Sequence, residues 1–262
     1  MENTVRTRAA GESKTGPVRR ANEDGYAVSE PLGLVVVADG MGGHAAGEVA
    51  SRLAIDTVTA FIARSSDNPE FSWPYGIVPS LSYNGNRLRT AVYLANRKVF
   101  RTAEAQDEYL GMGTTVVAVL IASGRLVVAH VGDSRAYLLR GGELRLLTRD
   151  DSWLATVLAA DPTADASSFA THPMRNVLTN ALGSREDVDV HIQEHDIGPG
   201  DAVVLTTDGV HGVIETAGLL AVLAQSADPE TAAAGLVSAA LAAGSRDNAT
   251  AVVAMCDAGS PR

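Results

Sequence analysis

Hydrophobic and polar positions along the chain change period several times, and each period predicts a different element. Residues 34–38 form an unbroken apolar run, typical of a strand buried on both faces, and residues 26–28 predict a strand before it. From residue 47 to about 63 the apolar positions recur at helical spacing. A second helical stretch, with Asn84 as its expected cap, is predicted to end near Gln106. The chain is therefore expected to begin with strands and two helices.

The middle of the chain carries four short runs rich in β-forming residues. Ser-Gly, Gly-Asp and Gly-Gly pairs separate these runs, and because such pairs form tight turns, an antiparallel meander is expected. The runs are residues 114–122, 125–131, 134–140 and 143–148.

The last part of the chain contains further strands and a second pair of helices. Strands and helices are grouped rather than alternating as β-α-β units, which favours antiparallel sheets layered with helix pairs, an α+β fold. The expected elements are a short helix at 152–160, a polar loop at 161–173, a half-buried strand at 188–193, a buried strand at 202–207, helices at 217–225 and 229–243, and a strand at 248–256.

The composition is that of a folded globular chain, with 46% hydrophobic and 20% charged residues. Its 262 residues are compatible with a single domain, residues 1–262. Residues 67–86 contain Pro69, Pro74 and Pro79, and we expect them to be an insertion, more a packed connector than a docking surface.

The charge balance disfavours some partners and locations. The net charge is −10 and the 21 lysines and arginines are scattered, whereas nucleic-acid binding needs a basic face. No segment has 18 continuous apolar residues, and the first residues do not resemble a signal peptide, so no membrane association is expected. The single cysteine, Cys256, cannot form an internal disulfide, which agrees with a cytoplasmic location.

The glycine-rich stretch at residues 40–45 satisfies the dinucleotide-binding pattern G-x-G-x-x-A after a predicted strand. That fold needs an acidic residue roughly 20 positions later, at the end of a second parallel strand. The nearest candidate, Asp56, falls inside the predicted helix. A nucleotide site is therefore disfavoured.

Four aspartates follow apolar runs beside a glycine or an asparagine: Asp39, Asp133, Asp208 and Asp247. A single such aspartate is ordinarily a turn residue. Two of them follow runs expected to be central strands, where a carboxylate is costly unless a cation meets it. Because Mg²⁺ and Mn²⁺ take carboxylate, carbonyl and water oxygens, the pattern predicts a metal site to which Gly40 lends its carbonyl.

Seven segments carry recognisable motifs: RRANEDGY from Arg19, VADGMGGHAAGEVAS from Val37, GMGTTVV from Gly111, HVGDSRAYLLRGGELRLLTRDDS from His130, HPMRNVLTNALG from His172, GDAVVLTTDGVHGVI from Gly200 and SRDNATAVV from Ser245. In this order they resemble the motifs of the metal-dependent serine/threonine protein phosphatases, the type 2C class, in their bacterial form. The resemblance extends over about residues 4–256. It implies a four-layer αββα sandwich with two central antiparallel sheets between helix pairs.

The resemblance also implies ligands for two metal ions. Asp39 matches the ligand that bridges both ions. Glu23 and the Gly40 carbonyl match ligands of the second ion, and Asp208 and Asp247 match ligands of the first. Mn²⁺ or Mg²⁺ is the expected cofactor.

Other matched positions imply supporting roles. Asp133, together with Asp208, matches a weaker third metal site of bacterial members. Arg19 matches the arginine that holds the substrate phosphate. Asp24 and Asn248 match residues that orient the ligands and bound water.

The function implied is hydrolysis of phosphoserine and phosphothreonine in proteins by direct attack of a metal-bridging water. Such an enzyme opposes Ser/Thr kinases in signalling, so a partner kinase is expected, and the chain is expected to be a monomer. The alternative is a catalytically silent binding module of the same fold. Because every expected carboxylate is present, the active enzyme is favoured.

One position departs from many eukaryotic members of the family, which have a histidine directly after the Asp-Gly pair. Here that position is Met41. His44, three residues later, is either the acid that protonates the leaving group or an ordinary residue at a helix start, and the second interpretation is favoured.

Three further patterns resemble functional sites but are disfavoured. Cys256 and Arg262 have the spacing of cysteine-dependent phosphatases, but the chain leaves no room for the helix that such a loop needs. His191 and His195 are expected side by side on the solvent face of a strand, without a metal. His130 is expected to be a hydrogen-bonded histidine at a strand end.

Overall fold

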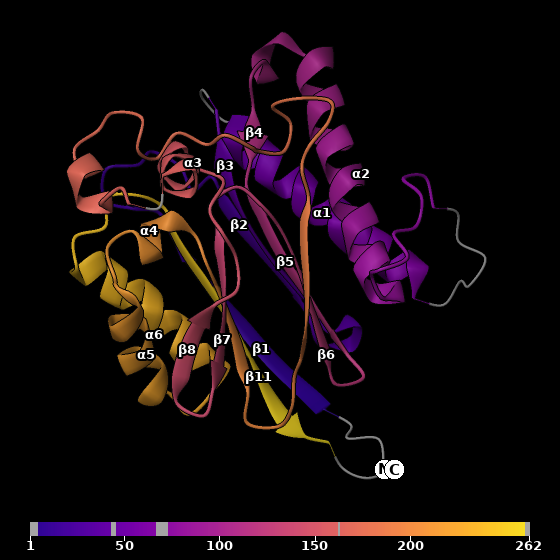
Figure 1. Cartoon of the computed structure of the whole chain (residues 1–262), viewed down its shortest axis with the longest axis vertical. Coiled ribbons are helices and arrows are strands. Elements are labelled where there is room, and N and C mark those ends of the chain that lie inside the picture. Colours follow the sequence, from indigo (N-terminus) through magenta and orange to yellow (C-terminus); the bar gives the residue numbers. More distant parts are fainter. Residues whose placement is uncertain (1–4, 43–45, 67–72, 162, 260–262) are drawn as a thin grey trace.

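A computed structural model of the chain describes residues 5–42, 46–66, 73–161 and 163–259. Two antiparallel sheets pack face to face, and helices cover the outer face of each sheet (Figure 1). The four-layer αββα sandwich expected from the resemblance is therefore confirmed. His44 lies outside the described residues.

The first sheet has five strands, each antiparallel to its neighbours. Its outer face packs against α5 (Thr216–Ala224) and α6 (Pro229–Ala242) through an apolar cluster that includes Val204 and Val253. In spatial order the strands are β1 (Val5–Lys14), β11 (Ala249–Ala258), β10 (Ala202–Thr206), β7 (Arg135–Arg140) and β8 (Glu143–Leu146).

The second sheet lies under the longest helices, α1 (Ala46–Ser65) and α2 (Tyr83–Ala105). Its strands are, in spatial order, β2 (Asp24–Ser29), β3 (Leu34–Met41), β5 (Val116–Ala122), β6 (Arg125–Val131) and β9 (His191–Asp196), with β4 (Gly113–Thr114) paired to the end of β3.

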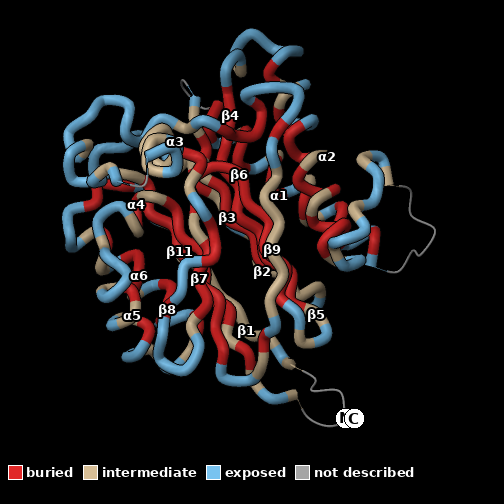
Figure 2. The backbone as a smooth tube through the Cα atoms, in the orientation of Figure 1, coloured by how far each residue is buried: buried red, intermediate tan, exposed pale blue. Residues whose placement is uncertain are grey.

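Strand β3 shows why an unbroken apolar run was needed here. Alternate side chains of a strand point to opposite faces. Val36 and Ala38 pack under the helices, whereas Val35 and Val37 pack against the other sheet. Both faces are buried, as the central red strands in Figure 2 show.

The remaining elements are short. They are α3 (Trp153–Ala160), α4 (Asp208–His211) and 3₁₀ turns at Glu30–Leu32, Asp107–Tyr109 and Ala166–Phe169.

The start of α2 differs from the prediction. Ser82, not Asn84, caps the helix, because its hydroxyl accepts a hydrogen bond from the Gly85 amide at 3.0 Å. Asn84 lies inside the first turn, where its Oδ1 accepts from Arg87 at 2.8 Å. Residues 83–86 therefore belong to the helix rather than to the insertion predicted at 67–86.

The predicted meander is wrong in one respect. β5–β6 and β7–β8 are hairpins, and positive φ angles at Ser123-Gly124 and Gly141-Gly142 turn the chain as those pairs suggested. However, β6 belongs to the second sheet and β7 to the first, so the chain crosses between sheets at residues 132–134. Gly132 makes the crossing with φ of 97°, and a Cβ there would lie 2.7 Å from Thr115.

Two strands were missed or misassigned. β1 was not predicted, because its sequence lacks an apolar run; it is an edge strand that pairs with β11 over ten residues. In β9, the register aligns His191 with His130 and His195 with Leu126, so both histidines face the other sheet. The prediction that these histidines share a solvent face was therefore wrong.

Candidate active site

The predicted site residues come together in one cleft of about 440 Å³. It lies where β3, β6 and β10 end and where β11 begins, so both sheets contribute to it. The predicted residues that line it are Arg19, Glu23, Asp39, Gly40, Asp133, Asp208, Asp247 and Asn248. Met41 lines it too, whereas Asp24 is buried behind it with 8% of its surface exposed.

Asp39 stands at the end of β3 with its main chain fixed on one side by Thr115. The Asp39 amide donates to the Thr115 hydroxyl at 2.9 Å, and the Asp39 carbonyl accepts from the Thr115 amide at 2.9 Å. The Thr114 hydroxyl donates to the same carbonyl at 2.8 Å. Backbone freedom at Asp39 is thus removed while its carboxylate stays in the cleft.

Glycine is the one residue type that fits at position 40. A Cβ there would lie 2.1 Å from the Gly47 carbonyl oxygen and 2.7 Å from that of Glu23. The close approach brings the start of α1 against the end of β3. Gly40 is therefore required by packing, whatever further role its carbonyl has.

The carboxyl groups of the cleft raise one another's pKa. Burial, followed by the charges of Asp24 and Asp208, holds the pKa of Asp39 well above its usual range. Burial and Asp208 raise the pKa of Asp133 to about 7. Burial and Asp247 raise the pKa of Asp208, whose buried Oδ1 has no hydrogen-bond partner among the described residues. The cleft is short of positive charge.

Among the described residues that line this cleft, Arg19 is the cation. It donates from Nη2 to Asp247 Oδ2 at 2.5 Å, and this hydrogen bond raises the pKa of the guanidinium. About half of the Arg19 side chain is exposed, and its other nitrogen donors remain accessible to an anion that enters the cleft.

Asp24 and Asn248 hold the surrounding segments together. Asp24 Oδ2 accepts hydrogen bonds from the hydroxyls of Thr207, at 2.9 Å, and Thr250, at 2.6 Å; burial raises its pKa to about 7. Asn248 Oδ1 accepts from the Glu23 amide at 2.9 Å. The segment that carries Glu23 is thereby tied to β10 and β11.

The donor set is made of oxygen atoms, which suits a hard dication. Within the described ranges, no three His, Cys, Asp or Glu side chains form a group that could hold a metal ion by themselves. An ion in this cleft would therefore need further oxygen ligands from the Gly40 carbonyl, from water or from a phosphate, which is the usual habit of Mg²⁺. With that completion, the residues present fit such an ion.

Several residues of the site were given no role by the sequence patterns. Thr115 contacts Asp39 and also shares a 2.7 Å hydrogen bond with the Ser134 hydroxyl, next to Asp133. Thr207 and Thr250 satisfy Asp24. The available signal was threonine at strand ends, in the GTT, LTT and NAT triplets.

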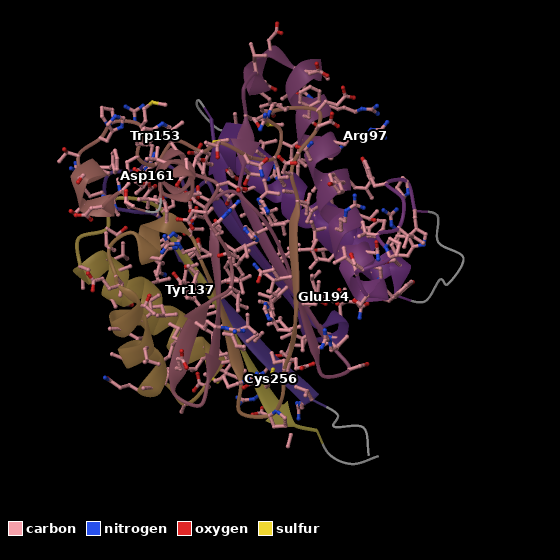
Figure 3. All side chains as sticks on the ribbon, viewed as in Figure 1. Arg97, Tyr137, Trp153, Asp161, Glu194 and Cys256 are labelled. Carbon is pink, nitrogen blue, oxygen red and sulfur yellow. The ribbon has the colours of Figure 1, made fainter. Side chains whose placement is uncertain are left out.

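Cys256 does not line this cleft. It lies in β11 with 2% of its surface exposed, and burial raises the pKa of its thiol to about 11. Figure 3 shows it at the opposite end of the sheets from Trp153. A thiol in this state is not a nucleophile.

An αββα sandwich with an acidic cleft at the ends of both sheets is the architecture of the metal-dependent phosphatases that the motifs resemble. The family model described as "Protein phosphatase 2C" matches residues 20–243. The serine/threonine protein phosphatase PstP of Mycobacterium tuberculosis is 36% identical over 251 residues, which are 96% of this chain and 45% of that protein. This chain therefore spans less than half the length of that relative.

Solved structures give the same result. The crystal structure of the M. tuberculosis serine/threonine phosphatase PstP/Ppp superposes with a TM-score of 0.82 at 34% identity, covering 96% of this chain and 99% of that chain. The catalytic domain of PstP in complex with two manganese ions superposes with a TM-score of 0.80 at 33% identity, covering 97% and 100%. The chain belongs to the protein phosphatase 2C family.

Proposed function

We propose that this chain is a metal-dependent protein serine/threonine phosphatase. The observation that carries the proposal is the cleft itself, in which five carboxylates from distant segments meet one arginine. Such a concentration of buried like charge is costly unless cations neutralise it. The related catalytic domain in complex with two manganese ions supports Mn²⁺, or the similar Mg²⁺, as the cation.

The proposed ligands are those that line the cleft. Glu23, Asp39 and the Gly40 carbonyl would hold one ion, and Asp39, Asp208 and Asp247 would hold the other, each completed by water. Asp133 serves a weaker third site with Asp208. When bound, two such dications would lower the pKa of a water molecule and neutralise charge on the phosphoryl oxygens.

The chain's own residues bind the phosphate and hold the carboxylates of the cleft in position. Arg19 binds phosphoryl oxygens through the nitrogen donors that Asp247 leaves free. Thr115 holds the main chain of Asp39 in place, and the hydroxyls of Thr207 and Thr250 donate hydrogen bonds to Asp24 behind the cleft. Met41 lines the cleft and has no proton to give to the leaving oxygen.

The proposed substrates are proteins phosphorylated on serine or threonine, and the proposed setting is signalling opposite a Ser/Thr kinase. A cytoplasmic location and a monomeric state belong to the same proposal. The buried free thiol of Cys256 is compatible with a reducing compartment. In the described part of the chain, no helix is long and apolar enough to span a membrane.

A phosphatase assay tests the proposal. The protein is incubated with p-nitrophenyl phosphate and with a phosphothreonine peptide, in Mn²⁺ or in EDTA. Phosphate release that needs Mn²⁺ and is lost in Asp208→Asn is the expected result. Release that is unaffected by EDTA, or no release with any dication, would overturn it, and the second outcome would favour a silent binding module.

A further inference from the structure

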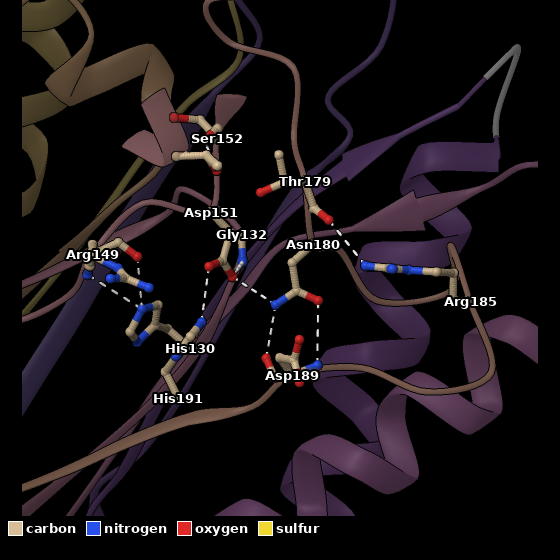
Figure 4. Close-up of polar contacts among 11 residues, drawn as sticks. His130, Gly132, Arg149, Asp151, Ser152, Thr179, Asn180, Arg185, Asp189 and His191 are labelled. Atoms are coloured by element: carbon tan, nitrogen blue, oxygen red, sulfur yellow. Dashed lines mark hydrogen bonds and ion pairs between the residues drawn. The ribbon is translucent and has the colours of Figure 1, made fainter. Parts of the chain in front are cut away.

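A polar network lies next to Gly132, the residue before Asp133, and its members Asp151, Asn180 and His191 do not line the cleft (Figure 4). At its centre is Asp151, which is 8% exposed. Its Oδ2 accepts hydrogen bonds from the Gly132 amide at 3.0 Å and from Asn180 Nδ2 at 2.8 Å. Its Oδ1 contacts His191 Nε2 at 2.9 Å. Both oxygens of this buried carboxylate are therefore partnered by groups of the protein.

The main chain of Asp151 strengthens the link to Gly132. The Asp151 amide donates to the Gly132 carbonyl at 3.0 Å, which is the reverse of the side-chain contact. Gly132 directly precedes Asp133 and carries the positive φ with which the chain crosses between the sheets. The residue before Asp133 is thus held on both its N–H and its C=O.

Asp150 holds the other side of Asp133. Its two oxygens accept hydrogen bonds from Arg135 Nε at 2.9 Å and from Arg135 Nη2 at 2.8 Å. Arg135 is two residues after Asp133. Asp151 is therefore hydrogen-bonded to the residue before Asp133, and Asp150 to the residue two positions after it. We call this pair of aspartates the Asp150–Asp151 brace.

The same residues support one wall of the cleft. The wall consists of residues 176–178, which line the cleft beside Asp133. The Asp151 carbonyl accepts from the Thr179 amide at 2.8 Å, and the Trp153 amide donates to the Val177 carbonyl at 2.8 Å. Asn180 extends the support by donating to the Asp189 carbonyl at 2.8 Å.

We propose that Asp150 and Asp151 are positioning residues, which fix the Asp133 carboxylate against the cleft wall and so set the affinity of the metal site that Asp133 serves. The inference rests on the proposed function for the identity of that site. Neither aspartate lines the cleft of Asp39. Asp150 does line an adjoining cavity that Asp133 and Asp208 also line, so its charge reaches Asp133 directly, whereas Asp151 acts through Gly132 and the wall.

Mn²⁺ binding measured by calorimetry tests the brace without any turnover. The Mn²⁺ site whose affinity falls in Asp133→Asn is taken as the site that Asp133 serves. Asp151→Ala is expected to weaken that site by about tenfold, the usual cost of removing a residue that orients a ligand, and to leave the other sites within about twofold. The matched control is Asp189→Ala, which removes an exposed carboxylate whose main chain contacts Asn180; it should bind as the wild type does.

A double-mutant cycle on kcat/KM for a phosphothreonine peptide provides the second readout. If the brace acts through Asp133, Asp151→Ala adds little to the loss already caused by Asp133→Asn. A general structural role would instead multiply the two losses, and that result would overturn the inference. It is also overturned if Asp151→Ala weakens every Mn²⁺ site equally, or if no Mn²⁺ site depends on Asp133.

Two outcomes keep the inference separate from the proposed function. If the wild type binds Mn²⁺ but releases no phosphate, the proposed function fails while calorimetry still decides the brace. If Asp151→Ala does not fold, Asp150→Ala enters the same measurements, because the Asp150–Arg135 pair is part-exposed and its loss is less disruptive. That variant should also weaken the site that Asp133→Asn affects.

Discussion

Two carboxylate centres lie on either side of Asp133, and they differ in how their charge is satisfied. In the network behind it, Asp151 is met by an amide, a carboxamide and an imidazole of the protein. At the cleft, the buried Oδ1 atoms of Asp208, which lines it, and of Asp24, which lies behind it, have no hydrogen-bond partner within the described residues. The pKa of Asp208 is raised by burial and by Asp247.

The difference separates two uses of buried carboxylates. The Asp151 network stabilises the fold, whereas the carboxylates of the cleft serve the proposed function. A buried carboxylate with a full set of donors stabilises the structure, and its loss leaves those donors unsatisfied. A cluster of carboxylates that is short of donors and of positive charge destabilises the cation-free protein, and it gains stability when a cation binds. Substitutions in the two centres should therefore move stability in opposite directions.

Asp39→Asn should have the largest effect. We expect phosphatase activity to fall by more than about a hundredfold, because a ligand to both proposed ions is weakened and several kcal/mol of charge stabilisation are at stake. In EDTA, the melting temperature should rise by about 2–4 °C for each kcal/mol of repulsion removed. Turnover assays and thermal unfolding with and without Mn²⁺ measure both effects. Near-normal turnover with bound Mn²⁺ would contradict the assignment of Asp39.

Arg19→Ala should have the next largest effect, and on substrate binding more than on turnover. A hydrogen bond to a charged group contributes about 1.5–3 kcal/mol, so KM for a phosphothreonine peptide should rise by about tenfold or more while metal binding persists. Steady-state kinetics at saturating Mn²⁺ give the two constants separately. Arg19→Lys keeps the charge but loses the planar donor pair, so only partial recovery is expected. An unchanged KM in Arg19→Ala would remove Arg19 from the phosphate site.

Asn180→Ala probes the satisfied centre. It takes one donor from Asp151 and leaves the Asp189 carbonyl without its side-chain partner. The free energy of unfolding, measured with urea in EDTA, should fall by about 1–3 kcal/mol. Asp189→Ala, which removes an exposed carboxylate nearby, should stay close to the wild type. A gain in stability in Asn180→Ala would contradict the conclusion that the Asp151 network stabilises the fold.

The smallest expected effect is a pH dependence that Asp24 confers on the cation-free protein. Burial raises the pKa of Asp24 to about 7 in the folded state, above its value of about 3.9 in an unfolded chain. The folded state then binds the proton more tightly, so the contribution of Asp24 to stability falls as the pH rises towards 7 and is constant above it.

Asp24→Asn removes this dependence. Between pH 6 and pH 7 the variant should gain stability relative to the wild type by at most about 1.4 kcal/mol, the value of one pH unit for one proton. Urea unfolding in EDTA at a series of pH values measures the difference. A difference that stays constant across this range would mean that Asp24 is already ionised in the folded protein.

Most elements of the fold could be predicted because their periods are strong. The run at Val35 and Val37 and the helical spacing before Ser65 leave little choice of structure. β1 could not be predicted, because its pairing with β11 depends on long-range hydrogen bonds rather than on an apolar pattern. The crossing at Gly132 was equally hidden, since Gly-Asp looks the same whether the next strand returns to the same sheet or enters the other.

For the site, the residues that line the cleft could be predicted, but their hydrogen-bond partners could not. Aspartates after buried runs, combined with the family motifs, identified the residues that line the cleft. The partners of those residues were not identified, because Thr115 and Thr250 are distant in sequence from the carboxyl groups they serve. Nor did any pattern distinguish Asp151, whose importance depends on three donors that the fold brings from separate segments.

The pairing of β1 with β11 has a practical consequence for handling the protein. Val5 pairs with Ala258, while Ala249, at the other end of β11, adjoins the cleft residue Asn248. The outer ends of β1 and β11 lie together (Figure 1). Because ten residues of extended strand span about 30 Å, these ends are far from the cleft that Asn248 lines. A fluorescent reporter attached at the outer end of β1 or β11 is therefore held far from the substrate entrance.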